Sequence, residues 1–322
     1  MAERTILLTG VAGFIGSHAA SALLRRGERV VGLDNFDAYY DPARKRENLR
    51  EVAAEAPGRT LELVEGDVRD RDLLRRLFEQ HRFDVVIHLA AMAGVRASVE
   101  RPWLYYDVNL TGTLNLLELT REFPSPSFVF ASTSSAYGNS AEMPFVETAA
   151  ADRPLAPYPA SKRAAELLGH TYHHLNGLCF TALRFFTVYG PRGRPDMMAH
   201  KIMNSLRSGE QIPLYEGGRL ERDWTYVTDI VEGVVAASER SSGYEIINLG
   251  RGEPVRVSDF LAELEACAGK KANTVVMPMP KADVEGTFAD IGKARRLLGY
   301  APRVSVSEGA RLTWEWFEKT RV

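Results

Sequence analysis

Two side chains that could carry out acid–base chemistry lie four residues apart in the chain. These are Tyr158 and Lys162, and an α-helix would place them on one face. A phenol with a pKa of about 10 is a poor base at neutral pH, but a neighbouring cation stabilises its ionised form. Such a base can remove the hydroxyl proton of an alcohol while a hydride leaves the same carbon. Any long helix can show this spacing, so the pair taken alone favours an ordinary helix surface pair.

A run of hydroxyl side chains lies shortly before this pair. Ser132, Thr133, Ser134 and Ser135 follow a strand that we expect over 127–131. A hydroxyl at the end of that strand could hold the oxygen of an alcohol and later that of a ketone. Serine and threonine also crowd ordinary turns, so this run is a candidate only in combination with other features.

A glycine motif near the N-terminus has the spacing of a dinucleotide-binding turn. Gly10, Gly13 and Gly16 lie between an expected strand (5–9) and an expected helix (14–26). The first glycine permits the tight turn, the second lets the backbone approach a pyrophosphate, and the third lets helix and strand pack closely. A turn that needs glycine for its own geometry is the alternative.

An acidic residue supports the dinucleotide interpretation. Asp34 ends the second expected strand, 18 residues after Gly16, close to the spacing of about 20 at which a carboxylate binds the adenosine ribose. The same carboxylate would repel a 2′-phosphate, so NAD is favoured over NADP. The residues expected to contact the cofactor are Gly10, Gly13, Phe14, Ile15, Gly16, Asp34, Asn35, Asp67, Val68, Leu89, Ala90 and Ala91.

The elements that must position these residues follow a βαβ pattern. Short runs rich in leucine or β-branched residues alternate with longer amphipathic runs. The expected strands are 5–9, 29–33, 61–64, 84–89, 127–131 and 179–184, and the expected helices are 14–26, 70–81, 100–121 and 158–175. Right-handed crossovers between them predict an α/β protein with a Rossmann-type doubly wound parallel sheet. Segment 35–60 is interpreted as an insertion.

The regular alternation of strands and helices ends after Gly190, and the expected elements beyond it are shorter and more irregular. We expect an NAD-binding domain made of 1–190 plus about 227–250. A smaller mixed α/β domain that binds the substrate would be made of about 191–226 and 252–322.

Composition limits the classes of partner. Forty Lys and Arg against 42 Asp and Glu give a net charge of −2, which offers little attraction for nucleic acid or an anionic membrane. Two cysteines cannot form a disulfide framework, and His170, His173 and His174 lack the partners of a metal site. No apolar run is long enough to span a membrane, and the first strand begins too early for a signal peptide. We therefore expect a cytoplasmic protein without metal.

Together these motifs resemble the extended short-chain dehydrogenases/reductases, and more closely the nucleotide-sugar epimerases and dehydratases, over nearly the whole chain. The resemblance implies that Tyr158 is the base, Lys162 its partner and Thr133 the hydroxyl residue of the triad. It also implies that Asn109 steadies the backbone of the site, and that Asn109, Tyr158 and Lys162 contact NAD. Members of this family often pair as homodimers through the helices that correspond to 100–121 and 158–175.

Other positions narrow the substrate by resemblance. Dehydratases carry an aspartate and a glutamate where Ser134 and Ser135 stand, and UDP-glucuronate decarboxylases carry a glutamate at the second of these positions. The run from Phe185 to Met197, with Thr187 and Arg194, resembles UDP-glucuronate 4-epimerases, in which these two residues would bind the sugar carboxylate. The substrate-binding residues that the resemblance implies are Arg96, Thr133, Ser134, Ser135, Tyr158, Thr187, Arg194, Arg222 and Asp283.

The resemblance thus implies NAD-dependent conversion of UDP-glucuronate to UDP-galacturonate. The alternatives are a 4-epimerase for UDP-glucose or another UDP-hexose, and a UDP-glucuronate decarboxylase. A non-catalytic dinucleotide-sensing protein is a further alternative, but it would be expected to have lost Tyr158 or Lys162. We expect no nucleic-acid or membrane partner and expect a homodimer.

Overall fold

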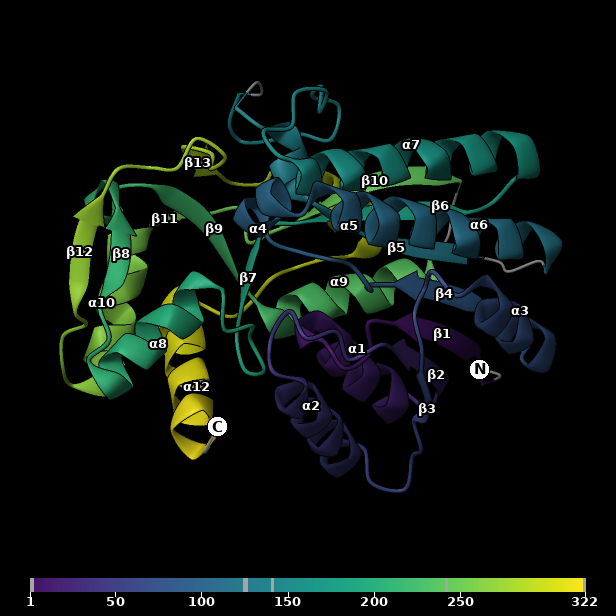
Figure 1. Cartoon of the computed structure of the whole chain (residues 1–322), viewed down its shortest axis with the longest axis horizontal. Helices are drawn as coiled ribbons and strands as arrows, with labels where there is room; N and C mark the ends of the chain where they lie inside the picture. Colours follow the sequence, from purple (N-terminus) through teal and green to yellow (C-terminus); the bar gives the residue numbers. More distant parts are fainter. Residues whose placement is uncertain (1–2, 124–126, 140–141, 241–242, 321–322) are drawn as a thin grey trace.

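A seven-stranded parallel sheet forms the larger part of the computed structural model, which describes residues 3–123, 127–139, 142–240 and 243–320 (Figure 1). Its strands lie in the order β10-β6-β5-β4-β1-β2-β3. The direction of winding changes between β1 and β4, which is where doubly wound sheets bind their ligands. The bounds are β1 (Thr5–Thr9), β2 (Arg29–Asp34), β3 (Glu62–Glu65), β4 (Val85–His88), β5 (Ser127–Thr133), β6 (Phe180–Phe185) and β10 (Tyr244–Leu249). The predicted Rossmann-type sheet is confirmed.

Helices cover both faces of this sheet (Figure 1). One face carries α3 (Arg71–Gln80), α6 (Gly112–Glu122) and α7 (Pro157–Asn176), and the other carries α1 (Phe14–Arg25) and α9 (Val227–Glu239). Neighbouring residues of a strand enter different cores: Ile6 and Leu8 pack with α1 and α9, and Leu7 packs with α3 and α6. Because both faces are covered, the central strands are largely apolar, as in the Ile6-Leu7-Leu8 run of β1 and the Val85-Val86-Ile87 run of β4.

Segment 35–60, interpreted above as an insertion, contains the helix α2 (Pro42–Glu55), which packs on α1. The helix begins where its sequence allows, because Pro42 occupies its first turn and the Asp41 side chain accepts a hydrogen bond from the backbone of Ala43 at 2.9 Å. The segment therefore brings an ordered element against the cofactor end of the sheet.

The helix predicted over 100–121 is present as one continuous helical run made of α5 (Pro102–Tyr106), a π-helical turn (Asp107–Thr111) and α6. A short helix that was not predicted, α4 (Val95–Glu100), precedes this run and is separated from it by a break. The break falls at Arg101 (φ −131°, ψ 50°) because the residue before a proline is disfavoured in the helical conformation. The helix predicted over 158–175 is present as α7 and ends at Gly177 with φ +69°.

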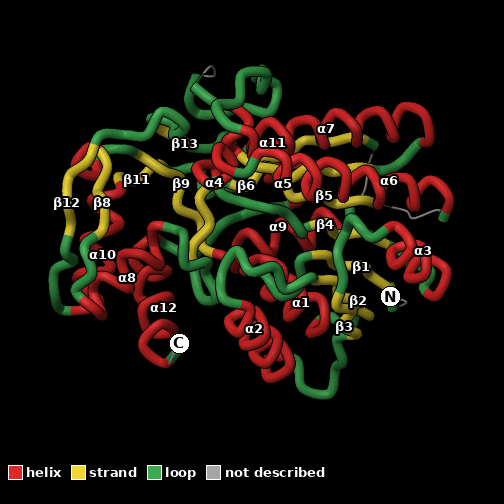
Figure 2. The backbone as a smooth tube through the Cα atoms, viewed as in Figure 1, coloured by secondary structure: helices red, strands yellow, loops and turns green. Residues whose placement is uncertain are grey.

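A smaller group of elements lies beside the sheet, as Figure 2 shows. Strand β9 (Glu221–Tyr226) pairs with β7 (Thr187–Tyr189), β11 (Pro254–Arg256) and β13 (Gly286–Thr287), and β8 (Ile212–Tyr215) pairs with β12 (Thr274–Met277). Helices α8 (Met198–Ser208), α10 (Val257–Ala268) and α12 (Val306–Lys319) pack around a core where Trp224 and Phe260 stack at 3.9 Å between ring centroids. Helix α11 (Gly292–Leu298) packs against α9 and β10.

The chain crosses between the two groups of elements more than once. After β9 it forms α9 and then β10, which pairs in parallel with β6 from Tyr244 opposite Phe180 to Leu249 opposite Phe185. Within the described ranges, no helix has the length and apolar character needed to cross a membrane. The described residues also contain no group of three or more His, Cys, Asp or Glu side chains placed to hold a metal ion.

Candidate functional site

A cleft opens at the carboxyl ends of β1, β2, β4 and β5, and it brings together most of the residues singled out in the sequence. Every residue predicted to contact the cofactor lines this cleft except Asn109. The lining includes Gly10, Gly13, Phe14, Ile15, Gly16, Asp34, Asn35, Asp67, Val68, Leu89, Ala90, Ala91, Tyr158 and Lys162. The glycine turn and the Tyr158/Lys162 pair, about 150 residues apart in the chain, therefore face one space.

The glycine turn between β1 and α1 leaves no room for side chains. Gly10 has φ +71°, and a Cβ atom on it would lie 2.7 Å from the backbone nitrogen of Ala90. A Cβ atom on Gly16 would lie 2.0 Å from the carbonyl oxygen of Gly10. Helix α1 begins after Gly13 without a side-chain cap or an acidic residue in its first turn. Its free backbone N–H groups and positive dipole end suit a phosphate group.

Asp34 lies at the end of β2 with its carboxylate almost fully buried. Its oxygens accept hydrogen bonds from the backbone nitrogens of Ala12 (3.0 Å) and Phe36 (2.9 Å). Burial raises the pKa of Asp34, and the charge of Lys45, whose Nζ is 4.0 Å from Oδ1, opposes that rise. Lys45 comes from α2 and also lines the cleft. The sequence reasoning missed this buried lysine.

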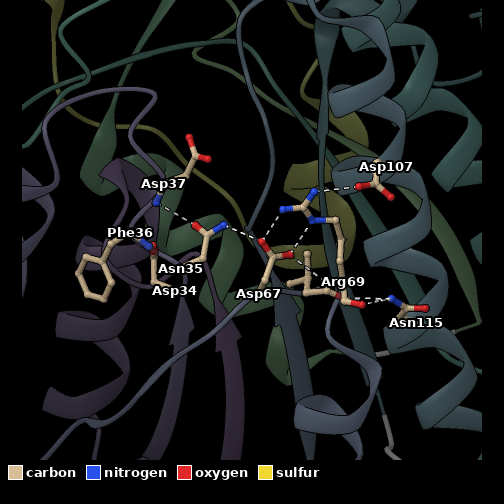
Figure 3. Close-up of polar contacts among 9 residues, drawn as sticks. Asp34, Asn35, Phe36, Asp37, Asp67, Arg69, Asp107 and Asn115 are labelled. Atoms are coloured by element: carbon tan, nitrogen blue, oxygen red, sulfur yellow. Dashed lines mark hydrogen bonds and ion pairs between the residues drawn. The ribbon is translucent and has the colours of Figure 1, made fainter.

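A second set of polar groups holds the neighbouring turn after β3 (Figure 3). Asn35 Nδ2 donates to Asp67 Oδ2 at 2.8 Å. The Arg69 guanidinium binds both oxygens of Asp67, at 2.9 and 2.8 Å, and also Asp107 at 2.8 Å. Arg69 holds the pKa of Asp67 at about 2, so this carboxylate is charged. Asn115 donates to the carbonyl oxygen of Val68 at 3.1 Å and fixes the same turn from α6.

Tyr158 and Lys162 occupy the first turns of α7, and the Thr133 hydroxyl at the end of β5 hydrogen-bonds with the Tyr158 phenol. Lys162 is only 1% exposed, and its Nζ atom has no hydrogen-bond partner among the described residues. It lies 4.6 Å from the centroid of the Phe130 ring. Buried cations are normally paired, so this ammonium group is placed to bind a polar ligand. Burial lowers its pKa to about 7.

The electrostatic surroundings of the Tyr158 phenol include a residue that the sequence argument had assigned elsewhere. Burial raises the pKa of Tyr158. The strongest opposing influence is the positive charge of Arg194, followed by the hydrogen bond with Thr133. Arg194 lines the same cleft as Tyr158. A guanidinium beside the phenol favours the phenolate, which is the form a base requires.

Arg194 already has a carboxylate partner within its own loop. Its Nε and Nη2 atoms donate to the two oxygens of Asp196 at 2.9 and 2.8 Å. The Tyr39 hydroxyl donates to Asp196 Oδ2 at 3.1 Å, and the guanidinium lies 5.9 Å from the centroid of the Tyr39 ring. Tyr39 comes from the segment that precedes α2, and the sequence reasoning missed its contact with this loop.

Long-range contacts fix the loop that carries Arg194. The neighbouring Arg192 has φ +60° and a fully buried side chain that pairs with Glu51, at 2.8 Å from Nε, and with Glu55 of α2. The His18 ring on α1 donates to the carbonyl oxygen of Pro191 at 2.9 Å. Helices α1 and α2 therefore set the position of the loop relative to the cleft.

The remaining predicted substrate residues line two further hollows. Ser134, Ser135, Thr187, Arg222 and Asp283 line one of them, and Arg96, Thr187 and Asp283 share the other. Thr187 therefore faces both of these hollows, whereas Arg194 faces the cleft that contains Tyr158. Tyr39 lines both the first cleft and the hollow that contains Arg96. The two residues predicted to bind one carboxylate thus lie around adjoining spaces and not in one.

The two other predicted substrate cations have partners within the chain. Arg222 donates to the carbonyl oxygens of Glu221 (2.7 Å), Val284 (2.8 Å) and Glu285 (3.2 Å). The Arg96 guanidinium pairs with Asp283 at 2.5 Å and lies over the Tyr215 ring. This pair joins α4 to the loop before β13, across the hollow that both residues line.

Asn109 lies in the π-helical turn behind the cleft. Its Oδ1 atom accepts from the backbone nitrogen of Met92 at 2.8 Å, and its Nδ2 atom donates to Met92 O and to Ser161 Oγ, both at 3.0 Å. Met92 itself lines the cleft. The side chain of Asn109 therefore holds the lining backbone and ties it to α7.

The parallel sheet, the glycine turn and the Tyr158/Lys162 pair on one cleft define a dinucleotide-dependent α/β protein that is equipped to oxidise and reduce an alcohol carbon. Comparison with known proteins agrees. The model of the NAD dependent epimerase/dehydratase family matches residues 6–250, and the chain belongs to that family.

Several relatives cover nearly the whole chain. It is 44% identical over 311 residues to a UDP-glucuronate 4-epimerase from Thermodesulfobacterium geofontis, covering 96% of this chain and 95% of that one. UDP-glucuronate 4-epimerase 3 from Arabidopsis thaliana is 42% identical over 331 residues, covering 97% of this chain and 76% of that protein.

Solved structures are similar as well. UDP-glucuronic acid 4-epimerase from Bacillus cereus, in complex with UDP-glucuronic acid and NAD, has a TM-score of 0.90 at 35% identity and covers 98% of this chain and 99% of that one. UDP-glucose 4-epimerase from Thermotoga maritima, with UDP-glucose, has a TM-score of 0.89 at 34% identity with the same coverage of both chains.

Proposed function

We propose that this chain is an NAD-dependent UDP-glucuronate 4-epimerase that interconverts UDP-glucuronate and UDP-galacturonate through a 4-keto intermediate. The observation that carries the proposal is the position of Arg194 beside Tyr158 in one cleft. In a glucuronate the carboxylate is attached to carbon 5, next to the reacting carbon 4. A group that binds the carboxylate must therefore lie close to the group that takes the proton from the hydroxyl at carbon 4.

The residues of the cleft fit NAD. Glycines occupy the positions where a Cβ atom would collide with the backbone, and the first turn of α1 offers uncapped N–H groups. The Nζ atom of Lys162, which has no hydrogen-bond partner in the described part of the chain, suits a ribose hydroxyl. Asp34 keeps lone pairs free for the hydroxyls of the other ribose. Bound NAD would accept the hydride from carbon 4 of the sugar and return it to the opposite face.

The side chains of the protein perform the proton transfers and hold the sugar. Tyr158 accepts the proton from the hydroxyl at carbon 4 and later returns it. Thr133, which hydrogen-bonds with that phenol, orients the sugar oxygen. The positive charge of Arg194 favours the phenolate, and Lys162 would add to this effect when it is protonated. Ionised Tyr158 is the form that begins the reaction.

The 4-keto intermediate of this substrate is a β-keto acid, which loses carbon dioxide when the bond to the carboxylate lines up with the ketone. Holding the carboxylate in a fixed orientation suppresses that side reaction. A guanidinium can do this through two parallel hydrogen bonds. Arg194 holds Asp196 in that manner in this structure. Thr187 would supply a further donor from the adjoining hollow.

A second candidate is a 4-epimerase for a neutral UDP-hexose. It is favoured by the same Arg194–Asp196 pair, because an arginine that already has a carboxylate partner does not require one from the substrate. Incubation of the purified protein with UDP-glucuronate and with UDP-glucose, followed by NMR, separates these candidates. UDP-galacturonate as the main product supports the proposal. Turnover of UDP-glucose alone contradicts it, and release of carbon dioxide with a UDP-pentose would indicate a decarboxylase.

We further propose that the parallel sheet with its helices is the NAD-binding domain and that about 191–226 and 252–322 form the nucleotide-sugar domain. Arg96, Arg222, Ser134, Ser135 and Asp283 would then surround the nucleotide sugar where the two meet. The proposal is supported by the hollows that these residues line at the junction of the two groups of elements.

A homodimer is also proposed, through the outer faces of α5, α6 and α7. Large apolar side chains are exposed on these helices, with Trp103 87%, Leu167 54% and Leu175 70% exposed. Exposed apolar groups concentrated on neighbouring helices favour an interface. Light scattering after gel filtration measures the oligomeric state, and Trp103→Glu should weaken association.

The free thiols of Cys179 and Cys267 fit a cytoplasmic location.

A further inference from the structure

The carboxylate of Glu166 is completely buried on α7, one turn beyond Lys162, and the reaction described above does not use it. Its Oε1 atom accepts from Ser132 Oγ at 2.5 Å and from Arg184 Nε at 2.9 Å. Its Oε2 atom accepts from Arg184 Nη2 at 2.7 Å and from Arg163 Nη1 at 3.0 Å. A buried carboxylate with this many charged and polar donors is costly to assemble and is strongly held once formed.

These partners come from the elements that form the catalytic end of the cleft. Ser132 precedes Thr133 at the end of β5 and lines the cleft itself. Arg184 lies on β6 directly opposite Ser132 in the parallel register. Glu166 therefore joins two adjacent strand ends to the helix that carries Tyr158 and Lys162. The distance between the Thr133 hydroxyl and the Tyr158 phenol depends on the relative position of the same two elements.

The charge of Glu166 also acts on Lys162. Burial lowers the pKa of Lys162, and the negative charge of Glu166 opposes that effect. From β4, His88 faces Lys162, and burial followed by the charge of Lys162 keeps the pKa of His88 well below its ordinary value. His88 lies between the hydroxyls of Thr9 (2.7 Å) and Thr113 (3.0 Å) and is therefore neutral at pH 7.

Two tyrosines lie beside Glu166 and its partner Arg184. Arg184 also lies over the Tyr137 ring, 4.5 Å from its centroid. From β10, the Tyr244 hydroxyl donates to the backbone carbonyl oxygen of Glu166 at 3.0 Å, and burial raises the pKa of Tyr244 to about 12. Tyr244 is therefore neutral, and the charged groups in contact with the Glu166 carboxylate are Arg184 and Arg163.

We propose that Glu166 is a positioning residue of the active site, which fixes the Ser132–Thr133 end of β5 against the face of α7 that carries Tyr158 and Lys162. As a consequence of its charge, it also keeps Lys162 protonated at higher pH than burial alone would allow. The effect of Glu166 on turnover rests on the proposed UDP-glucuronate 4-epimerase function, whereas its effect on the protonation of Lys162 does not. The opposing interpretation is that the ion pair stabilises the fold and has no influence on the catalytic groups.

The first experiment tests the charge without a sugar substrate. The 13Cε signal of Lys162 in lysine-labelled protein, assigned with Lys162→Met, is followed against pH in wild type and in Glu166→Gln. Glutamine keeps the shape of the side chain and removes its charge. The midpoint of the Lys162 titration, about 7 in the wild type, should move to lower pH in Glu166→Gln. An unchanged midpoint overturns the electrostatic part of the proposal.

The second experiment tests the positioning. Ser132→Ala removes the contact between Glu166 and β5 but leaves the ion pairs, so it should keep the Lys162 midpoint. It should lower kcat about ten- to a hundredfold with KM for UDP-glucuronate unchanged, which is the scale of a small misplacement of catalytic groups. Wild-type kcat in Ser132→Ala overturns the positioning. If Glu166→Gln does not fold, Ser132→Ala decides the proposal.

Glu28→Gln is the matched control, because Glu28 is mostly buried and pairs with Arg4 at 2.6 Å, and neither residue lines the cleft. It should lower the melting temperature while leaving kcat and the Lys162 midpoint unchanged. If it moved either quantity, the effects of Glu166→Gln would count as general destabilisation and the proposal would fail. If wild type does not convert UDP-glucuronate, the proposed function fails, and the Lys162 titration still tests Glu166.

Discussion

Replacing Arg194 by alanine separates substrate recognition from acid–base chemistry. The loss of one charge-assisted hydrogen bond to a carboxylate costs about 1.5–3 kcal/mol, or roughly ten- to a hundredfold in affinity. In this structure the guanidinium already binds both oxygens of Asp196, and Tyr39 binds the same aspartate. A substrate carboxylate must displace Asp196 or share the guanidinium with it. The net contribution of Arg194 to the binding free energy therefore falls at the lower end of that range. We expect KM for UDP-glucuronate to rise about tenfold in Arg194→Ala.

The same change should affect kcat through Tyr158. Because the charge of Arg194 lowers the pKa of Tyr158 against the effect of burial, its removal raises that pKa further. The base must be deprotonated, so a higher pKa leaves a smaller fraction of it active at pH 7. The acidic limb of the kcat profile should therefore move to higher pH, and it should do so for UDP-glucuronate and UDP-glucose alike. KM for UDP-glucose should stay nearly constant.

The assay is steady-state kinetics with both sugars across a range of pH. Arg251→Ala is the control, because Arg251 is also 22% exposed and pairs with an acid two residues further on, Glu253. It does not line the cleft and should leave both kinetic constants unchanged. An equal rise of KM for acid and neutral sugars in Arg194→Ala would refute recognition of the carboxylate. A kcat profile that does not move would refute the coupling to Tyr158.

Three other perturbations test separate parts of the argument. Tyr158→Phe should lower kcat at least about a hundredfold with an unchanged circular dichroism spectrum, and near-normal turnover would remove Tyr158 from the mechanism. Asp34→Ala should weaken NAD binding and reduce discrimination against NADP in fluorescence titrations; equal binding of both cofactors by wild type would contradict the role of Asp34. His18 and His200 have pKa values that burial lowers to about 4, so the unfolded state takes up their protons first as the pH falls. The melting temperature should therefore decline between pH 6.5 and 4, and a smaller decline is expected in His200→Gln.

Local motifs were predictable where a few neighbouring residues determine the structure. The turn at Gly10 follows from the spacing of three glycines between a strand and a helix, and Asp34 follows from its position at the end of the next strand. The start of the helical run at Pro102 agrees with the predicted helix, because proline and the residue before it end any preceding helix. The short helix α4 before that boundary was missed, because its 6 residues are too few to show a helical period.

Contacts between distant segments could not be predicted in the same way. Lys45 and Tyr39 come from segment 35–60, which was interpreted only as an insertion, and they reach the cleft in a segment whose helix α2 packs on α1. The charge of Arg192 does not reveal that its side chain is buried against α2. Glu166 was within reach of the sequence argument, since it follows Lys162 at the same four-residue spacing that separates Lys162 from Tyr158.

The order in which the sheet is completed has a consequence for synthesis of the protein. Helix α1 packs against α9, and β6 pairs with β10, yet α9 and β10 follow β9 of the smaller group of elements. A ribosome that adds about 5–20 residues per second needs roughly 10 to 40 s to proceed from α1 to α9. During that time the part of α1 that contacts α9 stays uncovered, and the edge of β6 stays open for roughly 3 to 12 s until β10 is made. Chaperones that cover apolar segments would act on the emerging N-terminal half, and a fragment that stops before α9 would be expected to aggregate.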